Sequence, residues 1–232
     1  TDLDSGLDYG TIAISKYRKS DGTNSWLVTI PGTDGKHDSP FGWPQNVELM
    51  SSDSKQRMEA DSARMVQEAM KQAGIKSNEP VALIGHSQGG IVAATIASDL
   101  KDDYDIEHVV TAGSPVANHP IPEKTWVTSV EMDDELVAAL DGAANPSSDH
   151  WLTVRGTASK SSSNQESTFA GTPVTDAPDN KEITHWLKYH QAAYQNATDM
   201  GSTAVNTHER HFDEIIDGDL QEVMYFEGRM SK

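Results

Sequence analysis

Residues 81–92 read VALIGHSQGGIV, and this stretch sets a serine between glycines directly after a run of apolar residues. The apolar residues predict a buried parallel strand, and the small residues from Gly89 onward predict a helix. Ser87 then occupies the sharp turn between the two, where Gly85 and Gly89 let the strand and the helix pass close together. The pattern G-x-S-x-G at 85–89 is typical of a turn that presents a serine hydroxyl at the edge of a sheet.

Length and composition narrow the class of protein. The chain has 232 residues, no cysteine and a net charge of −18. Residues 1–232 fit one α/β domain, and the lack of cysteine excludes a cysteine nucleophile and a thiolate metal site. The negative charge argues against nucleic acid and anionic lipid surfaces as partners, and no apolar run has the length of about 20 residues that a membrane span needs. We expect a small-molecule partner and no stable membrane insertion.

The start of the chain carries a further expectation. The sequence begins at Thr1, without an initiator methionine, and no signal-peptide pattern is present. We therefore expect a mature form or an excised catalytic domain, and favour a secreted or cell-surface location over a cytoplasmic one.

Strand and helix signals alternate along the chain, which predicts a mostly parallel central sheet with helices on both faces. Polar residues 157–182 lack periodicity and predict a mobile or lid-like insert. Apolar runs around a turn signal predict an opening hairpin, and later runs predict further elements. The expected strands are 11–17, 25–30, 81–84, 108–114, 126–132, 150–156 and 220–230, and the expected helices are 54–73, 89–100, 184–197 and 208–218.

Ser87 needs a base to act as a nucleophile, and the base needs an acid to orient it. In this arrangement the chain order is serine, acid, histidine. The acid belongs after a strand that follows the serine, and the stretch WVTSVEMDDELV offers Glu131, Asp133 and Asp134 there. We choose Asp134, because Val137 can anchor its loop and Glu131 still belongs to the strand. Asp133 is the alternative.

Five histidines follow the acid and compete for the role of base. His150 begins an expected strand, and His208 and His211 lie in a polar helix where we expect exposure to solvent. His185 sits at a helix start, where a base is easily placed. His190 is followed one turn later by a tyrosine that can hold its ring. We prefer His190, with His185 as the alternative.

Acyl transfer also needs two backbone N–H donors where negative charge develops on the carbonyl oxygen. Gln88 supplies one donor, because it follows the serine. Thr33, in the stretch IPGTDG, supplies the other, and Gly32 lets the backbone approach. His208 and His211 are spaced by three residues, not by the four of H-E-x-x-H, so we expect neither a metal nor a cofactor.

The stretches LVTIPGTDG, PVALIGHSQGGIVAA, HVVTAGSPVA and ALDGAANP together resemble bacterial serine hydrolases of the α/β-hydrolase superfamily, in particular a lipase-like group common in actinobacteria. The resemblance covers roughly residues 25–200. It implies an α/β-hydrolase fold and a Ser-His-Asp triad of Ser87, Asp134 and one of His185 or His190. Members of the group often carry an additional helical N-terminal region.

These residues predict a hydrolase that cleaves small-molecule carboxylic esters through an acyl-enzyme. The alternatives are an acyltransferase or thioesterase with the same triad, and a catalytically silent binding protein on the same scaffold. Phe41 and Trp43 predict an acyl pocket for short or medium chains, or they pack their loop onto the domain.

Overall fold

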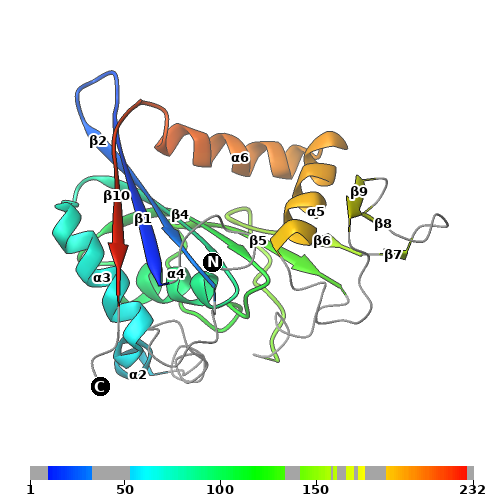
Figure 1. Ribbon diagram of the computed structural model, residues 1–232, viewed down its shortest axis with the longest axis horizontal. Helices are drawn as coiled ribbons and strands as arrows, with labels where there is room; N and C mark the ends of the chain where they lie inside the picture. The colour runs from blue at the N-terminus through cyan, green and yellow to red at the C-terminus, as the bar shows by residue number, and fades with distance from the viewer. Residues whose placement is uncertain are drawn as a thin grey trace.

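A seven-stranded sheet forms the centre of the structure, a computed structural model that describes residues 10–32, 53–133, 142–157, 159–160, 166–169, 172–175 and 187–228 (Figure 1). The strand order is β10-β1-β2-β3-β4-β5-β6. Strands β2 to β6 run parallel, while β1 pairs antiparallel with β2 and β10. The strands are β1 (Thr11–Arg18), β2 (Asn24–Ile30), β3 (Pro80–His86), β4 (Asp105–Ala112), β5 (Trp126–Met132), β6 (Trp151–Gly156) and β10 (Asp219–Glu227).

Helices cover both faces of this sheet, as the alternating pattern predicts. Because successive side chains of a strand point to opposite faces, β4 meets both layers: Val109 joins the core beneath α4, while His108 and Val110 face α6. The first layer holds α2 (Ser54–Glu59), α3 (Asp61–Ala73) and α4 (Gln88–Asp99), and the second holds α5 (Leu187–Asp199) and α6 (Thr203–Ile215). None of the described helices is both long and apolar enough to cross a membrane.

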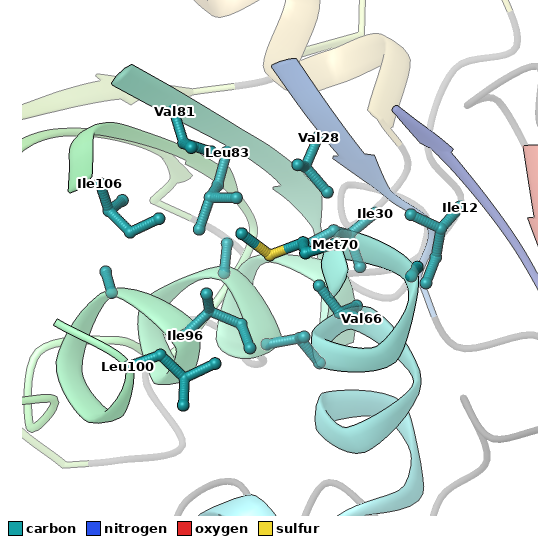
Figure 2. Close-up of a cluster of buried hydrophobic side chains, with 14 of the residues drawn as sticks. Ile12, Val28, Ile30, Val66, Met70, Val81, Leu83, Ile96, Leu100 and Ile106 are labelled. Carbon is teal, nitrogen blue, oxygen red and sulfur yellow. The ribbon is translucent and has the colours of Figure 1, made fainter. Parts of the chain in front are cut away.

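The larger core fills the space between the sheet and the helices α3 and α4 (Figure 2). Leu83 from β3, Met70 from α3 and Ile96 from α4 are fully buried there. A smaller core lies on the opposite face, where Val130 and Val154 pack against Tyr189 of α5. Burial of such side chains contributes about 1.5–3 kcal/mol each. Because the larger core buries more of them, the layer of α3 and α4 is held to the sheet more firmly than the layer of α5 and α6.

Two predicted elements differ in detail. The helix expected over 54–73 is broken at Ala60, whose ψ of 129° is extended, so that α2 turns toward α4. The insert expected to be mobile contains a three-stranded antiparallel sheet of β7 (Ser159–Lys160), β8 (Glu166–Phe169) and β9 (Thr172–Thr175). Strands of two to four residues are too short to show the alternation of apolar and polar residues by which a strand is recognised in a sequence.

A buried ion pair joins α2 to the C-terminal end of α4. The Arg57 guanidinium donates to both carboxylate oxygens of Asp99, at 2.9 and 2.6 Å. Both side chains are almost fully buried, at 3% and 6% exposure. A bidentate pair in this environment fixes the orientation of the two helices, and removing one partner leaves an uncompensated charge.

We expect Arg57→Ala to lower the free energy of unfolding by about 3–5 kcal/mol, because Asp99 then stays buried without a partner. Arg64→Ala is the matched control, since its pair with Asp61 is largely exposed and such pairs contribute about 0–1 kcal/mol. Urea denaturation of the three proteins measures both values. Equal losses in the two variants would contradict a structural role for the Arg57 pair.

Candidate active site

Ser87 lies between β3 and α4 in a backbone conformation that residues with a side chain rarely adopt. Its φ is 55° and its ψ is −123°. Within the described ranges it is the one residue other than glycine with a positive φ. Such a conformation persists only where the surroundings enforce it, and it is typical of functional sites.

Hydrogen bonds to the end of β4 hold Ser87 in this conformation. Its N–H donates to the Ala112 carbonyl oxygen at 2.8 Å, and the Ser114 hydroxyl donates to the Ser87 carbonyl oxygen at 2.8 Å. The same carbonyl accepts from the N–H groups of Gly90 and Ile91, at 3.0 and 3.3 Å. The turn is therefore tied to the neighbouring strand and to the first turn of α4. No sequence motif singles out Ser114, whose one signal is its place just after β4.

The glycines around Ser87 allow very close approach of the backbone, as predicted. A Cβ at Gly85 would overlap the backbone of Gly89, and a Cβ at Gly89 would overlap the carbonyl groups of Ile30 and Pro31. The end of β3, the start of α4 and the end of β2 therefore meet at one point.

The candidate oxyanion donors belong to this meeting point. Gln88 begins α4 directly after Ser87 and is 1% exposed. Thr33 lies outside the described residues, but Pro31, two residues before it, contacts the region of Gly89. The segment that leads to Thr33 thus approaches the N-terminus of α4, where the helix dipole favours negative charge.

The acid candidates follow β5, at the same edge of the sheet. Glu131 belongs to β5, as predicted, and Asp133 comes directly after the strand. The carboxylate of Asp133 accepts from the Thr157 hydroxyl at 2.9 Å and lies 3.9 Å from Arg155, with 47% of its side chain exposed. Asp134 lies outside the described residues.

His190 reaches the same region from α5. It is 1% exposed, and its ring meets the ring of His86 edge-on at 5.7 Å between centroids. His86 directly precedes Ser87, and Tyr194, one turn after His190, lines the same cavity. His185 lies outside the described residues.

A chain of hydrogen bonds links three histidines beneath α6. His208 Nε2 is 3.0 Å from the Asp149 carbonyl oxygen and must donate to it, so His208 Nδ1 accepts from the Thr128 hydroxyl at 3.2 Å. The Thr128 oxygen then accepts from His108 Nε2 at 2.8 Å, and His108 Nδ1 accepts from His211 Nδ1 at 3.0 Å. One assignment of protons satisfies the whole chain, here called the histidine relay, with every ring neutral.

The expected exposure of His208 and His211 is therefore wrong. His208 is 3% exposed, and His211 stacks on Trp126 at 4.2 Å between ring centroids. His150 stacks on the same indole at 4.5 Å. The sequence of α6 does not reveal this arrangement. Histidines that are buried because they hydrogen-bond to one another have the same sequence pattern as histidines on a polar surface. Among the described residues, no group of three or more His, Asp or Glu is arranged to hold a metal ion.

Burial keeps the relay uncharged. Desolvation, with His211 and His208 nearby, lowers the pKa of His108 from 6.5 to about 3. Desolvation also lowers the pKa values of His208 and His211. A charged imidazole loses its hydration in such a place, so the neutral form is favoured.

We expect stability to fall as the pH drops below 6.5. The unfolded chain gains protons on these histidines near pH 6.5, whereas folded His108 resists protonation down to about pH 3, so folding is favoured above this window. His108 alone accounts for a loss of about 2 kcal/mol between pH 7 and pH 5. Denaturant unfolding at several pH values measures the slope, and His108→Gln should make it shallower. An unchanged slope in the variant would contradict this account.

The comparison with protein families agrees with this architecture. The model of the PGAP1-like alpha/beta domain family matches residues 46–169, which is more than half of the chain and includes Ser87 and the acid candidates. No curated protein sequence matches the chain. Among solved structures, the chain is similar to the Lip2 lipase from Yarrowia lipolytica, with 13% identity and a TM-score of 0.29. That match covers 61% of this chain and 53% of the lipase, about half of the enzyme's length. With its parallel sheet between two helical layers, the chain has the α/β-hydrolase fold and belongs to the PGAP1-like alpha/beta domain family.

Proposed function

We propose that the protein is a serine hydrolase that cleaves carboxylic esters through an acyl-enzyme, with Ser87 as the nucleophile. The observation that carries the proposal is the enforced positive φ of Ser87 at the junction of β3 and α4. Strain of this kind costs stability, and a nucleophile elbow is the recurrent reason for a serine to bear it between a parallel strand and a helix. A structural serine at a helix start would adopt an ordinary capping conformation instead.

In the proposed reaction, the base takes the Ser87 proton as the oxygen attacks the ester carbonyl. Negative charge moves to the carbonyl oxygen, where the N–H groups of Gln88 and Thr33 stabilise it. The base then gives the proton to the departing alcohol, and a water molecule hydrolyses the acyl-enzyme by the same route in reverse. Gln88 suits its role because it begins α4 next to the nucleophile.

For the acid, the surroundings of Asp133 support Asp134. A carboxylate that orients a catalytic imidazole is buried and bound to the ring. Asp133 is half exposed, and its oxygens face Thr157 and Arg155. Asp133 therefore suits the role less well, and Asp134 stays our proposed acid.

For the base, the place of His190 supports our preference over His185. Its buried ring packs against His86, the residue just before Ser87. A base on a helix that packs on the sheet is held more rigidly than one on a loop. Tyr194 follows on the same side of α5 and lines the same cavity.

We expect Ser87→Ala to abolish labelling by a fluorophosphonate probe and hydrolysis of p-nitrophenyl acetate, because the hydroxyl is the group that reacts. Ser98→Ala is the matched control, since Ser98 also belongs to the α4 region but donates its hydroxyl to the Ala94 carbonyl oxygen. Gel fluorescence measures labelling, and circular dichroism checks the fold. Labelling that persists in folded Ser87→Ala would refute the proposed nucleophile.

We expect Asp134→Asn and His190→Gln each to lower kcat by about 10³–10⁴-fold, because a triad works as a unit. Asp133→Asn and His185→Gln should keep most of the activity. Steady-state kinetics on p-nitrophenyl acetate compares the four variants. A silent Asp134→Asn or His190→Gln, with activity lost in its counterpart, would reassign that role.

A further inference from the structure

A cavity of about 440 Å³ lies on the face of the sheet that α5 and α6 cover. Figure 1 shows these two helices at an angle to each other on this side of the molecule, and strands β2 to β5 form the opposite wall. The volume falls within the ~300–1,000 Å³ of typical small-molecule sites. Most of its wall is apolar, and the apolar residues that line it include Ile84, Val110, Ala112, Val130 and Phe212.

One end of the cavity adjoins the proposed nucleophile. Gly85 and His86, the two residues before Ser87, form part of its wall, and His190 faces them from α5. From there the cavity extends along the sheet to His108 and Thr128 in the middle of β4 and β5. The cavity therefore begins at the two residues that lead into the Ser87 turn.

The far end offers a ligand neither charge nor a free hydrogen-bonding group. It is formed by His108, Thr128 and His208, whose ring nitrogens and hydroxyl bond to one another within the histidine relay. Burial also lowers the pKa of His108 to about 3, so its ring is neutral at physiological pH. A polar or anionic group placed there would lose its hydration without gaining a partner.

The rim on α6 excludes anions as well. Glu209 and Asp213 line the cavity there. Desolvation, together with these two carboxylates, raises the pKa of Tyr194 to about 12. Their negative charge repels a carboxylate or phosphate that approaches from this side. The space therefore suits an uncharged, apolar group.

We propose that this cavity receives the aliphatic acyl chain of the ester substrate, so that the protein prefers medium-length acyl groups. The inference rests on the proposed function, because it needs Ser87 as the nucleophile. An acyl chain stays bound to the serine through both steps of the reaction, whereas the alcohol departs after the first. An apolar space beside the Ser87 turn suits the group that stays, and the volume of about 440 Å³ limits the length of that group.

Val110→Phe tests the proposal by filling the middle of the cavity from β4. We expect kcat/KM for p-nitrophenyl acetate to fall much less than the value for a long ester, because the short chain does not reach this position. The value for p-nitrophenyl decanoate should fall about tenfold or more, since several methylene groups of its chain would no longer be buried. Thr29→Phe, which lines the cavity from β2, repeats the test should Val110→Phe not fold. Val223→Phe, on the partly exposed face of β10, is the control that should change neither value.

A binding measurement separates this inference from the proposed activity. In the Ser87→Ala variant, the neutral fluorescent probe N-phenyl-1-naphthylamine should bind to the cavity, and decanol should displace it. In the double variant that also carries Val110→Phe, the probe should bind at least about tenfold more weakly. If Val110→Phe still labels with fluorophosphonate but keeps the chain-length preference of the original protein, only the proposed acyl site is overturned. Absent labelling with intact probe binding would overturn the proposed function alone. If Val110→Phe instead changes how kcat/KM depends on the length of the alcohol in a series of alkyl acetates, the cavity binds the alcohol and the inference is overturned.

Discussion

The positive φ of Ser87 is the constraint around which the rest of this edge of the sheet is arranged. The hydrogen bonds to Ala112 and from Ser114 hold the strained residue, and they require β4 to lie beside β3 in register. Gly89 must then admit the carbonyl groups at the end of β2, so three strands and one helix meet within backbone contact. Removing any of these contacts would let the turn relax and move the hydroxyl, because strain persists only while its surroundings enforce it.

The two faces of the sheet differ in how completely side chains fill the space between the strands and the helices. The face beneath α3 and α4 is closed by a large apolar core and by the buried pair of Arg57 and Asp99. The opposite face has a smaller core beside β5 and β6, and toward β2 and β3 it leaves a cavity instead. A pre-organised site needs a rigid layer on one side of the serine and open space for the substrate on the other. Movement of the rigid layer would shift the nucleophile out of line with the substrate.

Local pattern was enough to predict most of the fold and the turn that carries Ser87, while the roles of the candidate site residues stay predictions. The G-x-S-x-G stretch identified the turn, and the alternation of apolar runs predicted the strands in nearly correct bounds. Ser114 and the histidine relay escaped, because their meaning depends on pairing between β4, β5 and α6, which no spacing along the chain records. Asp134 and Thr33 fall outside the described residues and stay predictions.

The histidine relay couples the stability of the protein to the chemistry proposed for it. Each ring in the relay must be neutral for one set of hydrogen bonds to satisfy all of them, and burial beneath α6 enforces that state. A catalytic imidazole must also be neutral to accept a proton from a serine. Acid favours the unfolded chain, in which the relay histidines are free to charge. Because α6 both covers the relay and forms the rim of the cavity, protonation of the relay histidines would loosen the helix that bounds the cavity.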